Sequence, residues 1–443
     1  MAKLSQRKVS RKNNKKVSRK NRKNKSLTKT QNGGKLLGGT NLVNVCLEAC
    51  KIMAPMVKEI YAIIYEVDSP DKDGKGAFTI ADGIVQYLLE KYLFQDLFLA
   101  IVGEESAKVV IEGDNYSVTG DGDVNYDVPK KLYGIIDTAR VQIETLKKRL
   151  VKSGEDVFNY TDKYVFIDPI DGSTEFKTKL GGESTICIGF SDSQNNNKPF
   201  AGIVYRPITD EYALGCKSEN CFDSKFNAQK RVETYEPSPK MSKSYNNRTK
   251  LLDRYKQKLL TSRKDSEMSK YLLNFFKNGW SRESSGGAGN KMLMLLEGKA
   301  TAYIQDRGLS RWDTCAAQAV IEAKGGICCK LTDFIGGEDA SDGKIESYQY
   351  KESKDVNTDF TFYNGEMPSF TPYNINEVVK GKLGITKDNL NSKVESGELT
   401  VDIKNFNPYS NLCGIVAYLD PSKETDIRSA CKAMAKLSKP VYN

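Results

Sequence analysis

The stretch Asp168-Pro169-Ile170-Asp171-Gly172-Ser173 places two carboxylates, a backbone carbonyl and a hydroxyl in one turn. It follows the apolar run Tyr164-Val165-Phe166-Ile167, which predicts a buried strand, so the acids emerge at the carboxyl end of that strand. Open α/β sheets bind ligands at this edge. Two aspartates three residues apart repel each other as bare anions unless a cation lies between them. The stretch therefore predicts a divalent-cation site or, as the plainer alternative, an acidic turn.

Three other acidic positions have the same character. Ile101-Val102-Gly103-Glu104-Glu105-Ser106 is again an apolar run that ends in acids, Asp82 precedes a predicted amphipathic helix, and Asp313 stands at the start of an Ala-rich helix. The chain contains no histidine, so carboxylate and carbonyl oxygens are the ligands on offer. Hard cations such as Mg²⁺ prefer these oxygens.

In order along the chain, the acidic positions read Thr-x-Ala-Asp, Gly-Glu-Glu, Asp-Pro-Ile-Asp-Gly-Ser and Trp-Asp. This ordered pattern resembles the inositol monophosphatase superfamily of metal-dependent, lithium-inhibited phosphomonoesterases. Segments 286–291, 296–300 and 312–316 are similar to the 3′(2′),5′-bisphosphate nucleotidases within it. The resemblance runs, with gaps, from about Leu42 to the C-terminus. It implies a layered αβαβα sandwich of two subdomains, in the α+β or α/β class.

The resemblance also implies a role for each acidic position. The implied ligands of two or three Mg²⁺ ions, with inhibition by Li⁺, are Glu104, Asp168, the carbonyl of Ile170, Asp171 and Asp313. Asp82 and the hydroxyl of Ser173 would orient and deprotonate the attacking water, and Glu105 would support the site. The family usually has Thr where this chain has Ser173, so the hydroxyl is kept but the methyl that restricts its rotamer is lost.

The implied substrate-binding residues are Ser262, Arg263, Asp265, Gly287 and Lys291. In the nucleotidases, a Thr-x-x-His element and a glycine-rich segment hold the nucleotide. The glycine-rich turn before the predicted helix 289–297 also offers backbone N–H groups to an anion. Asp265 stands where the histidine would be, and a carboxylate neither stacks on adenine nor attracts phosphate. The resemblance favours release of the 3′-phosphate of 3′-phosphoadenosine 5′-phosphate, with inositol polyphosphate 1-phosphatase or inositol monophosphatase activity as the alternative.

Positive charge is concentrated at the N-terminus. The formal net charge is +10, yet residues 1–30 carry 13 Lys and Arg and no acid, which leaves −3 for the remainder. This composition predicts a disordered basic tail over residues 1–40 that contacts nucleic acid nonspecifically or carries a nuclear address, with a merely solvated extension as the alternative. A remote alternative for the whole chain is therefore a nucleic-acid-tethered protein with an inactive phosphatase core.

The remainder predicts an N-terminal α+β metal-binding subdomain at 41–210 and a C-terminal α/β subdomain at 211–443. Its polar stretches predict an insertion at about 333–405 and a linker or surface loop at 222–250. The helices expected from periodicity are 42–65, 82–93, 132–150, 265–277, 289–297 and 313–324. The expected strands are 97–102, 164–167, 184–190, 201–205 and 300–304.

The ten cysteines form no Cys-x-x-Cys pair, and several lie in apolar surroundings typical of reduced core thiols. We therefore expect a reducing compartment, the cytoplasm or the nucleus. No apolar stretch reaches 18 residues without a charge, so the sequence predicts no membrane span.

Overall fold

The computed structural model describes residues 42–66, 75–113, 115–120, 123–151, 160–217, 231–234, 257–263, 275, 279–305, 309–331, 334, 350, 410–411 and 415–437. Residues 39–443 form one compact unit. The predicted basic tail lies outside the described residues, as do most of the predicted insertion at 333–405 and most of the predicted helix 265–277.

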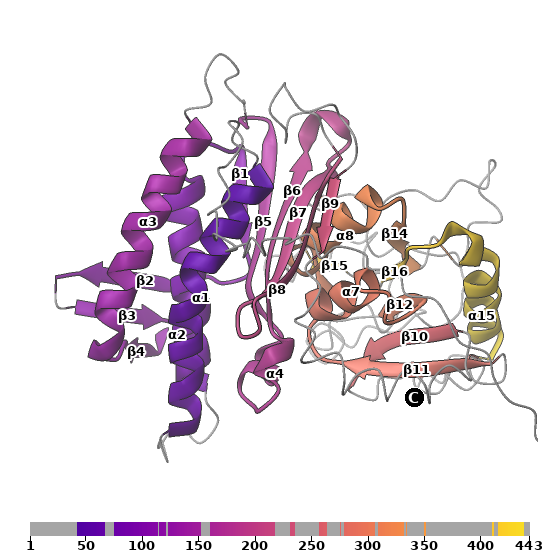
Figure 1. Cartoon of the computed structure of the whole chain (residues 1–443), viewed down its shortest axis with the longest axis horizontal. Helices are drawn as coiled ribbons and strands as arrows, with labels where there is room; N and C mark the ends of the chain where they lie inside the picture. The colour runs from indigo at the N-terminus through magenta and orange to yellow at the C-terminus, as the bar shows by residue number, and fades with distance from the viewer. Residues whose placement is uncertain are drawn as a thin grey trace, which may run out of the picture. The chain divides into compact units, whose positions relative to one another are not determined.

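A six-stranded sheet with the order β1-β5-β6-β7-β8-β9 forms the first β layer (Figure 1). Its strands are β1 (Ala100–Gly103), β5 (Lys163–Asp171), β6 (Thr185–Asp192), β7 (Lys198–Arg206), β8 (Glu211–Cys216) and β9 (Arg231–Thr234). Strands β1 and β5 are parallel, and the other neighbours are antiparallel. Both β8 and β9 follow the expected subdomain boundary at residue 210, yet they extend this sheet. The segment 222–250 is therefore not only a linker, because β9 lies within it.

Helices cover one face of this sheet (Figure 1). They are α1 (Leu42–Glu66), α2 (Lys75–Tyr87) with its π-helical continuation η1 (Leu88–Phe94), and α3 (Tyr133–Val151). The prediction that Asp82 precedes its helix is wrong, since α2 begins at Lys75 and Asp82 lies inside it. The reason is that Ile80 and Ala81, like Ile84, are buried, so the apolar face of the helix extends ahead of Asp82.

A small antiparallel sheet precedes α3. It consists of β2 (Lys108–Glu112), β3 (Asn115–Thr119) and β4 (Asn125–Asp127). The sequence predicts no strand here. The difference arises because the three strands are short and because β2 and β4 are largely exposed, which leaves little apolar periodicity in the sequence.

Two helices, α7 (Ala288–Leu296) and α8 (Arg311–Ala323), pack on the other face of the sheet (Figure 1). Helix α8 approaches the sheet closely at Gly189 and Gly202, which are paired between β6 and β7. A Cβ atom at Gly189 would lie 2.4 Å from the nitrogen of Ala316, and one at Gly202 would lie 2.3 Å from its oxygen. Only glycine permits this approach, which brings Asp313 at the start of α8 toward the carboxyl end of β5.

A second sheet, with the order β11-β10-β12-β16-β14, lies beyond α7 and α8. Its strands are β10 (Gln257–Ser262), β11 (Trp280–Ser285), β12 (Ala302–Gln305), β14 (Ile327–Lys330) and β16 (Ile415–Tyr418). Helix α15 (Glu424–Leu437) joins the apolar cluster of this sheet through Ile427, Ala430 and Cys431. The layers thus follow the order helix, sheet, helix, sheet, helix. This order confirms the predicted αβαβα sandwich.

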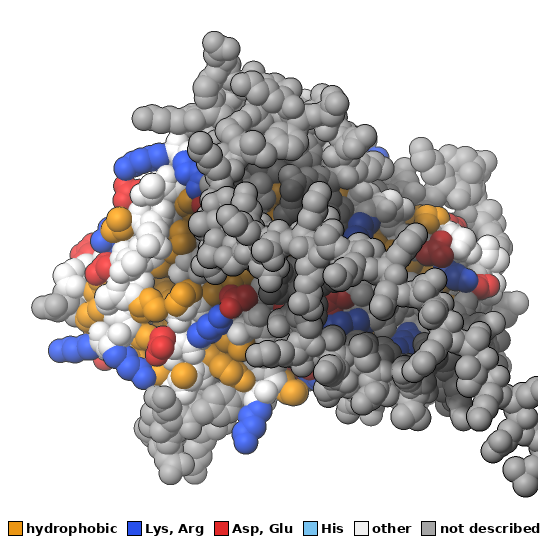
Figure 2. All heavy atoms as spheres, viewed as in Figure 1, with side chains coloured by type: hydrophobic (Ala, Val, Ile, Leu, Met, Phe, Trp, Pro, Cys, Tyr) orange, Lys and Arg blue, Asp and Glu red, His pale blue; other side chains and the backbone are white. Residues whose placement is uncertain are grey.

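Acidic and basic side chains lie close to one another on the described surface visible in Figure 2, rather than gathering by sign. Among the described helices, none combines the length and apolarity that crossing a bilayer requires. The free, buried cysteines are Cys46, Cys50, Cys187, Cys315, Cys328, Cys329 and Cys431. Cys216 takes part in a disulfide whose other cysteine lies outside the described residues, so it is an exception to the predicted reduced thiols.

Candidate active site

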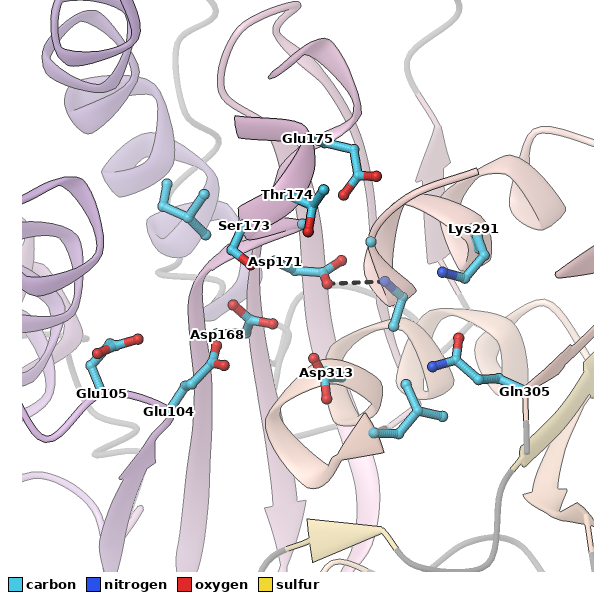
Figure 3. Close-up of a pocket in the computed structure, with 15 residues that line it drawn as sticks. Glu104, Glu105, Asp168, Asp171, Ser173, Thr174, Glu175, Lys291, Gln305 and Asp313 are labelled. Carbon is cyan, nitrogen blue, oxygen red and sulfur yellow. Dashed lines mark hydrogen bonds between the residues drawn. The ribbon is translucent and has the colours of Figure 1, made fainter. Parts of the chain in front are cut away.

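A cavity of about 270 Å³ opens at the carboxyl edge of β1 and β5 (Figure 3). Because the two strands are parallel and Gly103 pairs with Ile167, both strands end at the same edge. The N–H of Glu104 donates to the carbonyl of Ile167 at 3.1 Å, which places Glu104 beside Asp168. The cavity is lined by Glu104, Glu105, Asp168, Ile170, Asp171, Gly172, Ser173, Thr174, Glu175, Gly287, Ala288, Lys291, Gln305, Leu309 and Asp313.

Three carboxylates converge at one end of this cavity. Asp168, Asp171 and Asp313 each offer an oxygen, and these oxygens all lie within 4.8 Å of one another. Both oxygens of Asp168 are buried and accept no hydrogen bond of standard geometry from the described residues. An ionised carboxylate is strongly disfavoured in such a place unless a cation compensates it. The donors are all oxygen, so the cluster fits Mg²⁺.

The acids of the cluster raise one another's pKa. Burial, followed by the charges of Glu104 and Asp171, raises the pKa of Asp168 well above its usual value. Burial and the charge of Asp171 raise the pKa of Asp313 to about 7. Desolvation and the charge of Asp313 raise the pKa of Glu104 to about 8, although the surface of Glu104 is exposed at the cavity mouth.

Asp171 is held by the helix that follows the glycine-rich turn. Its two carboxylate oxygens accept hydrogen bonds from two N–H groups in the first turn of α7: from Ala288 at 2.9 Å, the dashed line in Figure 3, and from Gly289 at 2.7 Å. The hydroxyl of Thr185 donates to the same carboxylate at 3.1 Å. The sequence predicts a ligand anion at these N–H groups. The protein's own carboxylate occupies two of them instead, which orients Asp171 toward the cluster.

The residues predicted to activate water lie on neighbouring elements. Ser173 begins the short helix α4 (Ser173–Phe176) after Gly172, whose φ of 92° turns the chain out of β5, and it lines the cavity. Asp82 does not line the cavity: it is 1% exposed, and its oxygens, like those of Asp168, accept no standard hydrogen bond from the part of the chain that the structure describes. Burial, then the charges of Glu105 and Glu104, raise the pKa of Asp82, which places it close behind them.

Helix α2 also holds the backbone of Glu105, a residue that lines the cavity, through a second side chain. The side-chain amide of Gln86, one turn after Asp82, accepts from the N–H of Glu105 at 2.9 Å. The same amide donates to the carbonyl of Glu105 at 2.7 Å. One helix therefore carries Asp82 and also fixes the backbone that presents Glu105.

The predicted substrate-binding residues separate into two groups. Gly287 and Lys291 line the cavity, and Figure 3 shows Lys291 on the wall opposite Glu104 and Glu105. Lys291 is only 3% exposed, and its ammonium lies 5.7 Å from the ring centroid of Tyr303. Burial lowers the pKa of Lys291, although the charges of Asp171 and other acids oppose this shift.

Ser262 and Arg263 do not line the cavity. The hydroxyl of Ser262 donates to Gln305, a lining residue, at 3.0 Å. Arg263 forms ion pairs with Glu175, at 3.3 Å, and with Glu183. Asp265 lies outside the described residues.

Three residues around the cavity have no role in the prediction from sequence. Gln305 directly follows the predicted strand 300–304, and a polar residue at the end of an apolar strand is a signal that would have found it. Glu175 stands two positions after Ser173 in the sequence, so its nearness to the Asp-Pro-Ile-Asp-Gly-Ser stretch is a signal that would also have found it. Thr185 has no such signal, because its contact with Asp171 depends on the packing of β6 against β5.

The raised pKa values predict how metal-free stability depends on pH. The pKa of Asp313 and Asp168 is higher in the folded than in the unfolded state, so the folded state binds more protons between about pH 4 and 7. The free energy of unfolding in EDTA should therefore fall as pH rises through this window. The stabilisation by Mg²⁺ should grow over the same range. Thermal unfolding at pH 6 and 8, with EDTA or Mg²⁺, measures both; a Mg²⁺ effect independent of pH would contradict the prediction.

Known proteins resemble this chain over part of its length. Residues 129–354, just over half of the chain, match the Inositol monophosphatase family. The 3′(2′),5′-bisphosphate nucleotidase 1 of Rattus norvegicus is 28% identical over 209 residues, which are 44% of this chain and 58% of the relative. The inositol monophosphatase 3 of Xenopus laevis is 28% identical over 196 residues, 41% of this chain and 48% of the relative. The chain thus spans about half the length of the curated relatives it matches.

A solved structure of an inositol monophosphatase from Anabaena covers 90% of this chain, and the match covers 98% of that structure, at 14% identity and a TM-score of 0.40. The family match includes the Asp-Pro-Ile-Asp-Gly-Ser stretch and Asp313, two of the parts from which the carboxylate cluster is built. The protein therefore belongs to the inositol monophosphatase family, as the order of its acidic motifs predicts.

Proposed function

We propose that the protein is a Mg²⁺-dependent phosphomonoesterase that releases the 3′-phosphate of a 3′(2′),5′-bisphosphate nucleotide such as 3′-phosphoadenosine 5′-phosphate. The observation that carries the proposal is the charge distribution in the cavity. Asp168, Asp171 and Asp313 converge at one end, and the buried Lys291 lies on the wall opposite Glu104. A substrate with two phosphates can place one phosphate at the carboxylate cluster and the other beside Lys291.

The carboxylate end is suited to phosphoryl transfer. When bound, two or three Mg²⁺ ions neutralise the phosphoryl charge and lower the pKa of water, and Li⁺ would inhibit by replacing one of them. The residues that would hold the ions are Glu104, Asp168, the carbonyl of Ile170, Asp171 and Asp313. The Ser173 hydroxyl, which lines the cavity, orients the attacking water and relays the proton of that water to the carboxylate of Asp82, which is buried outside the cavity. Glu105 keeps this wall of the cavity negative.

Lys291 is proposed to bind the phosphate that is not cleaved. Lys291→Ala should raise KM for 3′-phosphoadenosine 5′-phosphate about 10- to 100-fold, because a charge-assisted hydrogen bond contributes roughly 1.5–3 kcal/mol. KM for adenosine 3′-monophosphate, which lacks the second phosphate, should change much less. Steady-state kinetics with both substrates tests this, and Lys299→Ala is the matched control, since Lys299 pairs with Glu297 and does not line the cavity. Equal changes in both KM values would show that Lys291 does not read the second phosphate.

A second candidate activity is the hydrolysis of an inositol phosphate. The observation that favours it is Gln305, whose side-chain oxygen accepts from Ser262 at 3.0 Å and from the hydroxyl of Tyr303 at 2.5 Å. These bonds orient the amide nitrogen toward the cavity (Figure 3). Together with the carboxylate of Glu175, which also lines the cavity, it is suited to bind ring hydroxyls.

A substrate panel tests the proposal. Phosphate release is measured with Mg²⁺ from 3′-phosphoadenosine 5′-phosphate, inositol 1,4-bisphosphate and inositol 1-phosphate, with Asp313→Asn protein as the blank for contaminating phosphatases. The highest kcat/KM is expected for the nucleotide. A preference for either inositol phosphate would establish the second candidate. Release from none of the three, at the level of the blank, would overturn the phosphatase proposal and favour an inactive core.

A further inference from the structure

Three consecutive residues at the start of β6 each hold a different part of the active site. Glu183 ends the short helix η4 (Gly181–Glu183), and Ser184 and Thr185 lead into β6. Ser184 donates to the carbonyl of Gly172 at 3.2 Å, and Thr185 donates to the carboxylate of Asp171 at 3.1 Å. Ser184 and Thr185 are both fully buried, and neither lines the cavity. We refer to residues 183–185 as the anchoring segment.

Glu183 holds the glycine-rich turn that leads into α7. One of its carboxylate oxygens accepts from the hydroxyl of Ser285 at 2.6 Å and from the N–H of Gly286 at 3.0 Å. Its other oxygen pairs with Arg263. Burial alone would raise the pKa of Glu183, but Arg263, Ser285 and Gly286 outweigh burial and lower it, so this carboxylate stays charged at neutral pH.

The turn is also held from its other side. The side-chain amide of Asn290 donates to the hydroxyl of Ser285 at 2.7 Å, and its oxygen accepts from the buried Arg206 at 2.7 Å. Asn290 is 1% exposed and Arg206 is 4% exposed. A row of hydrogen bonds therefore runs from Arg206 through Asn290 and Ser285 to Glu183, behind the cavity rather than in it.

Close packing leaves the turn little freedom. A Cβ atom at Gly286 would lie 1.8 Å from Cδ of Glu175, and one at Gly287 would lie 2.6 Å from Oδ2 of Asp171. Gly287 also has a φ of 57°, a conformation that favours glycine. A small displacement of the turn would therefore move the N–H groups of Ala288 and Gly289 away from Asp171.

We propose that the anchoring segment sets the position of Asp171 from two directions, through Thr185 directly and through Glu183 and the first turn of α7. Glu183 and Thr185 are thus positioning residues for the metal site, although neither touches the cavity. The kinetic test of this inference rests on the proposed function, because it measures phosphate release. Its second test, metal binding, is independent of catalysis.

Loss of either contact should weaken the metal site. Glu183→Ala and Thr185→Val should each raise the half-activating Mg²⁺ concentration by about 10- to 100-fold, the usual effect of removing a group that orients a metal ligand. Glu183→Gln keeps an oxygen for Ser285 and Gly286, and Thr185→Ser keeps the hydroxyl, so both should restore most of the lost affinity. At saturating Mg²⁺, KM should change less than the half-activating concentration does.

The metal titration is repeated by thermal unfolding, which needs no substrate. The Mg²⁺ concentration that half-saturates the rise in Tm should shift in Glu183→Ala and Thr185→Val as it does in the activity assay. Glu48→Ala is the matched control. It breaks an ion pair with Arg149 between α1 and α3, with side chains 33% and 33% exposed, against 27% and 34% for Glu183 and Arg263.

The outcomes separate positioning from general stability. A lower Tm in Glu183→Ala or Thr185→Val with the Mg²⁺ dependence of wild type, as expected for Glu48→Ala, would overturn the proposal. If Glu183→Ala does not fold, the comparison of Thr185→Val with Thr185→Ser decides it. If wild type releases no phosphate but its Mg²⁺-dependent Tm shift moves as predicted in the variants, the proposed function fails and the positioning role stands.

Discussion

Asp168→Asn is expected to lower kcat by about a thousandfold or more, equivalent to about 4 kcal/mol of transition-state stabilisation. Asp168 is fully buried, and its two oxygens accept no standard hydrogen bond among the described residues. One oxygen of Asp168, one of Asp171 and one of Asp313 all lie within 4.8 Å of one another. The amide keeps the shape of the side chain but removes the charge that a divalent cation needs. Activity is measured as phosphate release over a range of Mg²⁺ concentrations, so that weak binding is distinguished from lost turnover.

The same substitution should not harm the metal-free fold. Burial and neighbouring acids disfavour the charged form of Asp168, so Asn at this position should leave Tm in EDTA at pH 8 unchanged or higher. Asp420→Asn is a suitable control, because Asp420 caps a short surface turn by accepting from the N–H of Ser422 at 3.0 Å, which Asn can also do. Wild-type turnover in Asp168→Asn would exclude the proposed metal cluster, and a large drop in its Tm would mean that the carboxylate serves the fold.

Asp82→Asn should lower kcat by about 10²- to 10⁴-fold, the range for the loss of a general base. Asp82 is buried behind Glu104 and Glu105 and is proposed to take the proton from the water that Ser173 orients. If the two residues act as a unit, Ser173→Ala should lower kcat much less in Asp82→Asn than in wild type. Initial rates at saturating Mg²⁺ and substrate measure this double-mutant cycle.

Ser173→Thr is the control for that cycle. It keeps the hydroxyl and adds the methyl that the family usually has, so it should retain or improve kcat, whereas Ser173→Ala should lose activity. Full additivity of Asp82→Asn and Ser173→Ala would show that the two side chains act independently, and an active Asp82→Asn would rule out Asp82 as the base.

The carboxylate cluster proposed to bind the metal is largely predictable from the sequence because its parts are local. The Asp-Pro-Ile-Asp-Gly-Ser stretch stands at the end of a continuous apolar run, and that run is β5. Glu104 ends a second such run, and the parallel pairing of β1 with β5 brings it to Asp168. Asp313 could be placed only by the family resemblance, since its approach depends on two glycines in β6 and β7.

The rest of the site could not be read from local pattern because it depends on contacts between distant elements. The contacts of Asp171 with the first turn of α7, and of Glu183 with Ser285, join residues more than 100 positions apart. The family resemblance predicts that Arg263 binds the substrate, but in the structure its guanidinium forms ion pairs with the carboxylates of Glu175 and Glu183. The predicted polar insertion at 333–405 lacks periodicity in the sequence, and the family match ends within it at residue 354.

The cap that Asp171 makes on α7 connects the proposed cation site to the proposed phosphate site at Lys291. Asp171 is a member of the carboxylate cluster proposed to bind the metal, and Lys291, proposed to hold the second phosphate, lies one turn into α7. A cation that orders the carboxylate of Asp171 also restricts the motion of the first turn of α7, because the two are hydrogen-bonded. The affinity of Lys291 for a phosphate changes with the motion of that helix. Thermodynamic linkage requires this coupling to be reciprocal: the factor by which the cation tightens the substrate equals the factor by which the substrate tightens the cation.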